Sequence, residues 1–256
     1  MRLADALEVS PDEVVAFVGG GGKTTAMFRL AGEMVEAGER VITTTTTHIF
    51  AAQIALAPTS VAAADATQTS VSAALAAHRH VLVVGATDAG SGRAGGVSPE
   101  LFRRLRAWCP GVCILNEADG SRMRPFKAPA AHEAVIPTET TMVVAVVGAD
   151  VLGKTLDDAN VHRPELVSAL SGAALGTSIT PEIVAGVLAH PEGGRKGVPS
   201  GARFVALINK VERVADPAPI RETAERLLDE KAIHRVVLAA VRGDDPVREV
   251  YVGLAR

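Results

Sequence analysis

The chain has 256 residues, of which 48% are hydrophobic and 3% aromatic, with a net charge of −3 and a pI near 6.2. This length is enough for one large domain or two small ones with a substantial core. The small net charge argues against nucleic-acid or membrane partners, and no apolar run approaches the length of a membrane-spanning helix. Acidic residues interrupt the N-terminal segment, which is unlike a signal peptide, so we expect a cytoplasmic protein.

The first predicted strand runs into a glycine-rich loop. Apolar residues 14–18 favour a buried strand, and helical spacing starts at Lys23. The residues at this junction are Gly19, Gly20, Gly21, Gly22, Lys23, Thr24 and Thr25. Glycines let backbone N–H groups converge on phosphate oxygens at a helix start, where Lys23 would reach the β- and γ-phosphates and Thr24 would bind Mg²⁺. The junction therefore predicts a site for Mg²⁺ and a nucleoside triphosphate, ATP or GTP.

The loop differs from the common phosphate-binding pattern G-x-x-x-x-G-K-[ST], because Phe17 occupies the place of the first glycine. It is closer to the shorter loop of the Mur-ligase-like enzymes. A flexible turn that contains a lysine by chance is the alternative interpretation. The strand before the loop and the helix after it favour the nucleotide site.

The second predicted strand begins near Val41 and continues into five threonines, Thr43 to Thr47, followed by His48. A half-buried strand with polar edges would account for this composition, since threonine is β-branched. Ligands, however, bind at the carboxyl ends of strands in open parallel sheets. On that rule we expect Thr46 to contact Mg²⁺ or phosphate and His48 to contact a substrate.

Two carboxylates follow a later apolar strand, Val112–Leu115. Glu117 and Asp119 are two positions apart, so they would point to the same face if the strand continued through them. Magnesium prefers oxygen ligands beside the phosphates, and we expect Glu117 to hold Mg²⁺ or its water while Asp119 orients the attacking oxygen. A strand followed by a polar turn at Asp119 is the alternative.

A long connection, 120–140, comes next and contains three prolines. Loops of this length in compact domains are usually functional or disordered. Its cationic side chains suit an anionic substrate or the charge that develops in phosphoryl transfer, and we take Lys127 and His132 as candidate catalytic residues. A solvated charged run is the alternative. Further along, residues around 151–202 could form a small insertion that covers the site.

An apolar run near 204–208, which predicts a strand, is followed by Asn209, Lys210 and Glu212. This run resembles the N-K-x-D element with which GTPases bind guanine, but Glu212 replaces the aspartate, so the choice between ATP and GTP stays open. About seven predicted strands alternate with helices, without an internal repeat. This alternation predicts one P-loop NTPase-like domain over 1–256, an α/β fold with a doubly wound, mainly parallel sheet flanked by helices.

Several runs, taken together, resemble the YqeC family, accessory proteins associated with selenium-dependent molybdenum hydroxylases. The runs are FVGGGGKTT (17–25), TTTTTHIF (43–50), EADGSR (117–122), PFKAPAAHEAVIP (125–137), GADVLGK (148–154), NVHRPE (160–165), TPEIVAGVLAHPEGGRK (180–196) and INKVE (208–212). They extend over nearly the whole chain, with Ala134 as a small departure where the family pattern has proline. The resemblance implies a role in maturing or inserting a selenium-containing molybdenum cofactor, with a molybdenum hydroxylase or other cofactor-maturation proteins as partners.

Two functions from different classes are compatible with these features. In the first, the protein is an enzyme, an NTPase or a kinase- or ligase-like protein that hydrolyses the nucleotide or transfers its γ-phosphoryl group to a small acceptor. In the second, it is a GTPase-type switch or chaperone that delivers a cofactor to the apo-hydroxylase without chemistry on a small substrate. The glycine loop and the basic 120–140 segment favour the enzyme, and the Asn209–Glu212 element favours the switch.

Overall fold

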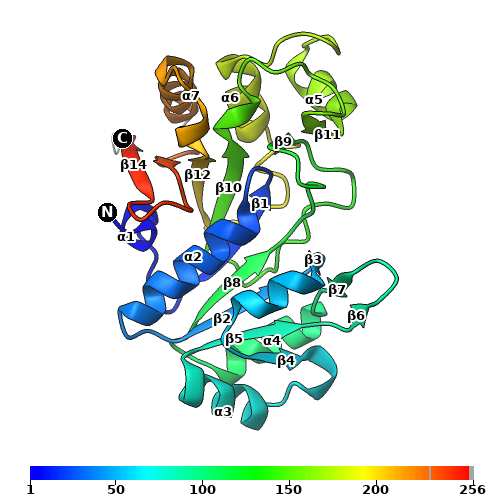
Figure 1. Ribbon diagram of the computed structural model, residues 1–256, viewed down its shortest axis with the longest axis vertical. Helices are drawn as coiled ribbons and strands as arrows, with labels where there is room; N and C mark the ends of the chain where they lie inside the picture. Colours follow the sequence, from blue (N-terminus) through cyan, green and yellow to red (C-terminus); the bar gives the residue numbers. More distant parts are fainter. Residues whose placement is uncertain (231, 254–256) are drawn as a thin grey trace.

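The computed structural model describes residues 1–230 and 232–253 and shows an α/β fold built on a nine-stranded sheet (Figure 1). Its strands follow the order β14–β13–β12–β10–β1–β8–β2–β5–β4, and in this sheet the pairings are parallel except that of β14 with β13. The strands are β1 (Val14–Gly19), β2 (Val41–Thr45), β4 (Ser60–Ala62), β5 (His80–Val84), β8 (Cys113–Glu117), β10 (Met142–Gly148), β12 (Arg203–Asn209), β13 (Arg235–Ala239) and β14 (Val247–Val252).

The middle strands are apolar along their length because helices cover both faces of the sheet. Strand β1, with the sequence VVAFVG, is buried from Val14 to Val18 and lies between β8 and β10. Alternate residues enter different cores, since Val15 and Phe17 pack in one hydrophobic cluster and Ala16 and Val18 in another. The carboxyl end of this fully enclosed strand is where the glycine-rich loop begins.

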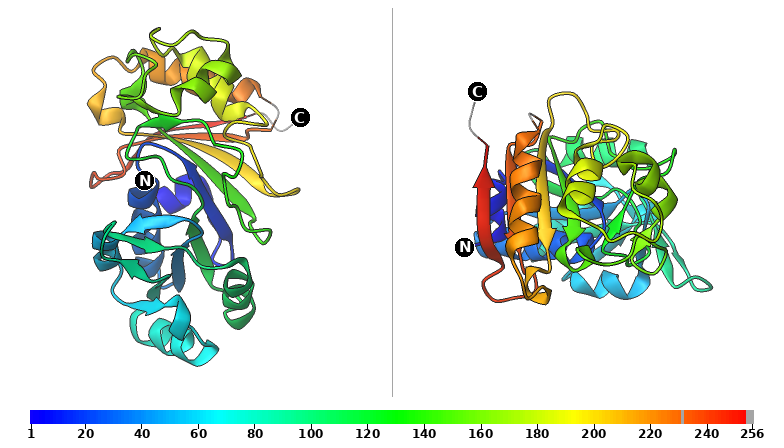
Figure 2. Two further views of the ribbon diagram at one scale, coloured as in Figure 1. Left: turned by 90° about the vertical axis from the view of Figure 1, so that its right-hand side faces the viewer. Right: turned by 90° about the horizontal axis from the view of Figure 1, so that it is seen from above.

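Helices pack on both sides of the sheet (Figures 1 and 2). One core holds α1 and α2 against the sheet; on the other face, one core holds α5, α6 and α7 and another holds α3 and α4. The helices are α1 (Leu3–Leu7), α2 (Lys23–Glu36), α3 (Gln68–His78), α4 (Pro99–Trp108), α5 (Pro164–Ser171), α6 (Pro181–Ala189) and α7 (Ala218–Asp229). None of the helices among the described residues has the length and apolar character needed to cross a membrane.

Two small sheets and four 3₁₀ turns lie beside the main sheet. Strands β3 (His48–Phe50), β7 (Arg93–Gly95) and β6 (Thr87–Asp88) form one antiparallel sheet, and β9 (Phe126–Lys127) pairs in parallel with β11 (Val161–His162). The turns are η1 (Ala51–Leu56), η2 (Ala63–Asp65), η3 (Ala149–Val151) and η4 (Val211–Arg213). Both small sheets follow carboxyl ends of main-sheet strands, and the first of them forms a wall of the cavity described below.

The threonine run has a structural role along β2. The hydroxyl of Thr43 lies 2.9 Å from His80 Nε2, that of Thr44 donates to Val83 O at 2.8 Å, and that of Thr45 donates to Glu117 O at 2.9 Å. These three side chains are fully buried, so their hydroxyls are satisfied by the neighbouring strands β5 and β8. Burial also lowers the pKa of the His80 imidazole to about 4.

The expected α/β class with a mainly parallel sheet flanked by helices is confirmed, but the expected number of about seven strands is wrong. The sheet has nine strands, and the two that were missed are its edges, β4 and β14. Strand β4 has the sequence SVA, which is too short and too poor in β-branched residues to stand out. Helix α3 begins at Gln68, where Thr67 and Ser70 cap it reciprocally.

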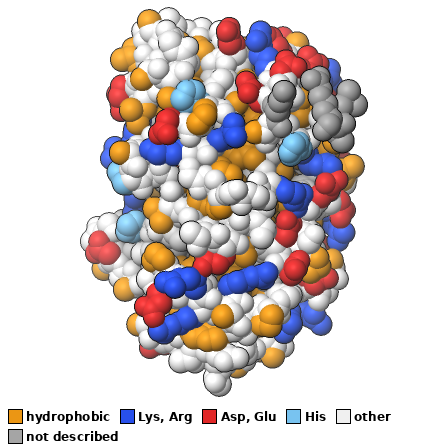
Figure 3. Space-filling view, turned by 180° about the vertical axis from the view of Figure 1, so that it is seen from behind, with side chains coloured by type: hydrophobic (Ala, Val, Ile, Leu, Met, Phe, Trp, Pro, Cys, Tyr) orange, Lys and Arg blue, Asp and Glu red, His pale blue; other side chains and the backbone are white. Residues whose placement is uncertain are grey.

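Charged side chains of both signs are mixed on the face opposite that of Figure 1. In Figure 3, the basic and acidic side chains lie interspersed, with apolar side chains scattered between them. This distribution matches the net charge of −3.

The close contact between the glycine loop and β10 can be tested by substitution. Gly21 and Gly38 have φ angles of +81° and +89°, where a side chain costs roughly 1–2 kcal/mol. A Cβ on Gly21 would lie 2.1 Å from the Gly148 nitrogen, whereas nothing lies within 4 Å of one on Gly38. We therefore expect Gly21→Ala to lower the free energy of unfolding in urea more than Gly38→Ala. Equal losses would contradict this packing.

Candidate functional site

The site lies at the carboxyl ends of β1, β8 and β12, where the order of strands along the chain changes direction. From β1 the chain passes to β2 and β8 on one side of the sheet and later to β10 and β12 on the other. A crevice at such a point is where open α/β sheets bind their ligands. The glycine loop, Gly19–Gly22, lies at the carboxyl end of β1 and leads into α2.

Protein groups accept the hydrogen bonds from the first three N–H groups of the loop. The N–H groups of Gly19, Gly20 and Gly21 donate to the Asp119 carboxylate, to Val146 O and to Arg124 O, at 3.0, 2.8 and 3.1 Å. The first N–H groups of α2 have no acceptor within the helix, and the helix dipole adds positive potential there. The anion-binding capacity of the junction therefore lies at the start of α2.

Lys23 is buried against the loop that precedes it. Its Nζ donates to Gly19 O at 2.7 Å and lies 3.2 Å from Asp119 Oδ1 and 3.7 Å from Glu117 Oε1, with only 4% of the residue exposed. Burial on its own would lower the pKa of the ammonium group. The carboxylates of Asp119 and Glu117 outweigh burial and raise this pKa, so Lys23 keeps its charge.

Glu117 and Thr24 place two oxygens together at the edge of the crevice. The Thr24 hydroxyl donates to Glu117 Oε2 at 2.5 Å, and Glu117 is the last residue of β8, opposite Phe17 of β1. Burial raises the pKa of the Glu117 carboxyl group, although Lys23 and Thr24 oppose the shift. A carboxylate and a hydroxyl at this spacing are hard oxygen ligands suited to Mg²⁺.

Asp119 lies beneath the loop, although we expected it to orient the attacking oxygen. Its two oxygens accept from the Gly19 N–H at 3.1 and 3.0 Å, and they pair with Lys23 and with Lys127, whose Nζ is 3.0 Å away. It is 2% exposed. Because β8 ends at Glu117, the alternation of a strand does not extend to Asp119, and only Glu117 of the two faces the crevice.

A chain of buried ion pairs continues from Asp119 into the later segments. Lys127 Nζ donates to Gly120 O at 2.7 Å and to Glu133 Oε2 at 2.5 Å, and Glu133 also accepts from Arg163 at 2.6 Å. Burial opposes ionisation of Glu133, but its bonds to Arg163 and Lys127 lower its pKa to about 2. Lys127 therefore pairs with two carboxylates of the protein, Asp119 and Glu133. Arg163, which shares Glu133 with Lys127, was not among the residues expected from the sequence, although the NVHRPE run contains it.

Asn209 joins the loop to the far side of the sheet. Its Nδ2 donates to Gly21 O at 2.8 Å, and its Oδ1 accepts from the Val241 N–H at 3.1 Å. Lys210 Nζ pairs with Asp150 at 3.0 Å. Glu212 is exposed, with its Oε1 3.8 Å from Arg213 Nε. Asn209 is thus fixed by the fold, whereas the Glu212 carboxylate is open to solvent.

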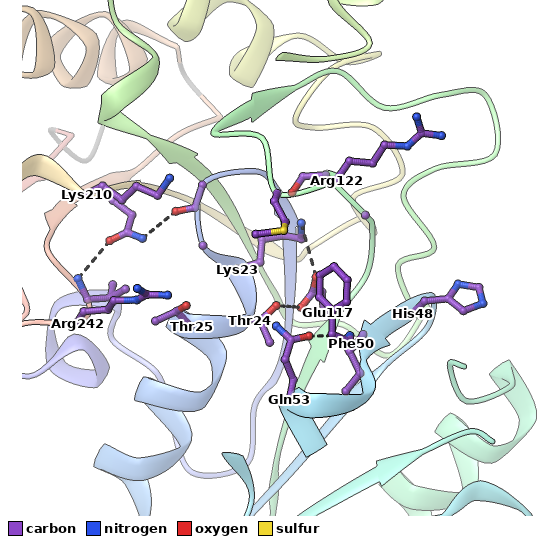
Figure 4. Close-up of a pocket in the computed structure, with 18 of the residues that line it drawn as sticks. Lys23, Thr24, Thr25, His48, Phe50, Gln53, Glu117, Arg122, Lys210 and Arg242 are labelled. Atoms are coloured by element: carbon purple, nitrogen blue, oxygen red, sulfur yellow. Dashed lines mark hydrogen bonds and ion pairs between the residues drawn. The ribbon is translucent and has the colours of Figure 1, made fainter. Parts of the chain in front are cut away.

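These elements enclose a cavity of about 480 Å³ (Figure 4). The expected site residues that line it are Gly21, Gly22, Lys23, Thr24, Thr25, His48, Glu117, Asn209, Lys210 and Glu212. Lining residues outside the candidate site expected from the sequence include Phe50, Gln53, Arg93, Arg122, Met123, Arg213, Val241 and Arg242. Arg122 belongs to the basic 120–140 segment and to the run EADGSR (117–122), and Phe50 lies in the run TTTTTHIF (43–50).

The remaining expected residues do not line the cavity. These are Gly19, Gly20, Thr46, Asp119, Lys127 and His132. The Thr46 hydroxyl donates to Val135 O at 2.6 Å and accepts from Asn116 Nδ2 at 3.2 Å, so it fastens the 120–140 segment to β8. His132 is exposed. Within residues 1–230 and 232–253, no group of three His, Cys, Asp or Glu side chains is placed to hold a metal by itself.

A family model and a known protein that resemble this chain both carry the name YqeC. The family model described as YqeC protein matches residues 15–165. An Escherichia coli (strain K12) protein, named as the uncharacterized protein YqeC, is 35% identical over 204 residues, which cover 77% of this chain and 75% of that protein. The matched range of the family model contains the glycine loop, Glu117 and the buried ion pairs as far as Arg163.

The pKa of Glu133 predicts a pH effect on stability. This pKa lies below the ordinary value of about 4.3, so the unfolded chain binds the proton more readily, and the free energy of unfolding falls as the pH decreases from about 5 to about 2. We expect Glu133→Gln to reduce this fall, measured as urea midpoints across that range. Glu100→Gln, which removes an exposed partner of Arg104 on α4, is the control and should keep the parent's pH dependence. The same slope in parent and Glu133→Gln would contradict the assignment.

Proposed function

The chain belongs to the YqeC family, and we propose that it binds a nucleoside triphosphate with Mg²⁺ in this cavity and hydrolyses it or transfers its γ-phosphoryl group. The observation that carries the proposal is the meeting of Lys23, Thr24 and Glu117 where the glycine loop, α2 and the end of β8 come together. This arrangement supports a P-loop-like site on a doubly wound sheet.

The phosphates would bind at the start of α2. The unpaired N–H groups of its first turn supply donors for phosphate oxygens, and the Lys23 ammonium is near enough to exchange its contact with Gly19 O for a phosphate oxygen. Since Asp119 and Glu117 keep this lysine charged, it can stabilise the negative charge that collects on the β,γ-bridging oxygen as the bond to phosphorus breaks.

The donors present fit a magnesium ion that is coordinated partly by nucleotide oxygens. Thr24 and Glu117 would hold the ion, with phosphate oxygens and water as its other ligands. When bound, Mg²⁺ offsets the charge of the β- and γ-oxygens. We assign the orientation of an attacking water to Glu117 as well, because Asp119, for which that role was expected, is enclosed by Gly19, Lys23 and Lys127.

The base of the nucleotide would lie toward Asn209, Lys210 and Val241. The bond from Asn209 to Gly21 places the Asn-Lys pair against the loop, as base recognition beside a phosphate site requires. Glu212 lines the same end and is a candidate acceptor for guanine N–H groups, but its exposure to solvent weakens any such bond. Both ATP and GTP therefore remain candidates.

The resemblance to accessory proteins of selenium-dependent molybdenum hydroxylases supports a role for this reaction in maturing a selenium-containing molybdenum cofactor. The acceptor of the phosphoryl group would then be a small molecule of that pathway. A second candidate function is a nucleotide-dependent switch that delivers the cofactor to an apo-hydroxylase. It is favoured by the Asn209 amide, which connects the glycine loop to Val241 and could relay the state of the nucleotide.

The proposal is tested first at Lys23. Lys23→Ala removes the ammonium beside the phosphates, and we expect nucleotide affinity or turnover to fall by at least a hundredfold, because one clamping group contributes several kcal/mol. Calorimetry with Mg²⁺ and ATP or GTP measures affinity, and phosphate release measures turnover. Lys154→Ala, at an exposed lysine outside the cavity, is the control and should behave like the parent. A folded Lys23→Ala protein with the parent's affinity would overturn the nucleotide site.

The different places of Glu117 and Asp119 predict different effects of their amide variants. Glu117→Gln removes a charged ligand from the ion, so we expect about a tenfold loss of nucleotide affinity that is seen with Mg²⁺ and absent with EDTA. Asp119→Asn leaves two buried lysines short of a counter-charge, and we expect the free energy of unfolding to fall by on the order of 3 kcal/mol. Calorimetry and urea unfolding of both variants separate the two roles. If Asp119→Asn changed Mg²⁺ dependence while stability stayed constant, the roles would be reversed.

A further inference from the structure

The cavity extends to both sides of Lys23. Figure 4 shows Lys210 and Arg242 on one side of Lys23 and the side chains of His48 and Arg122 on the other. The sheet order explains this division, because β12 and β13 lie beyond β10 on one side of β1, and β2, which precedes His48, lies beyond β8 on the other. A nucleotide that reaches from α2 toward Asn209 would leave the second side free.

We call the second side of the cavity the outer end. Its residues are His48, Phe50, Arg93, Arg122 and Met123, and all of them line the cavity. Since alternate residues of a strand point to opposite faces, β3 buries Ile49 in a small core and presents His48 and Phe50 on the exposed side. The outer end thus begins with an aromatic ring and an imidazole on one strand.

Arg93 is held over the Phe50 ring by strand pairing. The two residues are partners in the antiparallel pair β3–β7, and the guanidinium carbon of Arg93 lies 5.3 Å from the ring centre. A guanidinium in this position is attracted by the ring and is oriented before a ligand arrives. Phe50 is itself 42% exposed, so the ring keeps free surface for an apolar contact.

Arg122 and Met123 form the opposite wall in a strained conformation. Their φ angles are +48° and +64°, which non-glycine residues adopt at a cost of roughly 1–2 kcal/mol each. Backbone strain of this kind gathers at ligand-binding sites. Met123 is 79% exposed, and within the described part of the chain neither Arg93 nor Arg122 has a carboxylate partner within 4.0 Å. The outer end therefore offers two unpaired cations beside two exposed apolar side chains.

We propose that the outer end binds the acceptor of the γ-phosphoryl group, and that this acceptor is a small molecule with an anionic group attached to an apolar ring. An oxygen of the anionic group would form the new bond to the γ-phosphorus while the bond from that phosphorus to the β,γ-bridging oxygen breaks, and the nucleoside diphosphate would leave. The two guanidinium groups suit a phosphate or carboxylate, to which arginine donates two parallel hydrogen bonds. Phe50 and Met123 suit the ring, through stacking and sulfur contacts. This inference rests on the proposed function, because it identifies the second substrate of the same cavity.

The test uses the full chain saturated with Mg²⁺ and a non-hydrolysable ATP or GTP analogue, so that the start of α2 is occupied. The probes are 1-naphthyl phosphate and 1-naphthoate, followed by fluorescence, with inorganic phosphate and 1-naphthol as probes that lack the ring or the charge. We expect one of the ring-bearing anions to bind, and to bind more tightly than either partial probe. Tighter binding of the phosphate or of the carboxylate identifies the anionic group.

The variants Arg122→Gln and Phe50→Ala should each weaken binding of that probe about tenfold, since charge-assisted hydrogen bonds and aromatic contacts have this magnitude. Arg103→Gln, at an exposed arginine on α4, is the matched control and should leave the probe affinity within twofold of the parent's. If the parent binds nucleotide but neither naphthyl probe, or if Arg122→Gln and Phe50→Ala bind the probe as the parent does, the acceptor site is overturned and the nucleotide site stands. If the parent binds no nucleotide, both proposals fall.

Discussion

The pairing of Lys23 and Lys127 with the same buried carboxylate, Asp119, is the interaction on which the site depends. A buried charge is costly unless it is paired and hydrogen-bonded, and Asp119 meets this condition through two ammonium groups and the Gly19 N–H. The carboxylate therefore ties the start of the glycine loop to the segment that carries Lys127. From there, Glu133 and Arg163 extend the same ties to the residues before α5. The conformation of the loop is set by segments more than a hundred residues away along the chain.

The parts of the candidate site that lie where the sequence predicts them are those defined by local patterns. An apolar run followed by glycines, lysine and threonine can be placed at a strand end and a helix start without knowledge of the rest of the fold. Glu117 follows for a similar reason, because it ends a strand that is recognised from a local apolar run. The parallel arrangement of the sheet is likewise contained in the alternation of strands and helices.

Features that depend on distant partners could not be predicted in this way. Asp119 lies two residues beyond the end of β8, so the rule for strand faces no longer applies to it. The Thr46 hydroxyl donates to Val135 O, a contact between segments that no local pattern indicates. Phe50 and Arg93 come together only through the pairing of β3 with β7, more than forty residues apart. In each case the deciding neighbour comes from another part of the chain.

Asn209 limits how the cavity can change shape. Its amide binds Gly21 and Val241 at the same time and is itself 3% exposed, so a shift of the glycine loop has to carry the ends of β12 and β13 with it or break a buried hydrogen bond. The loop and these strand ends thus behave as one rigid wall. On the other side of the cavity, the short strands β3 and β7 bury one residue each. At this end of the cavity, a change of shape therefore costs a buried hydrogen bond unless β12 and β13 follow the loop.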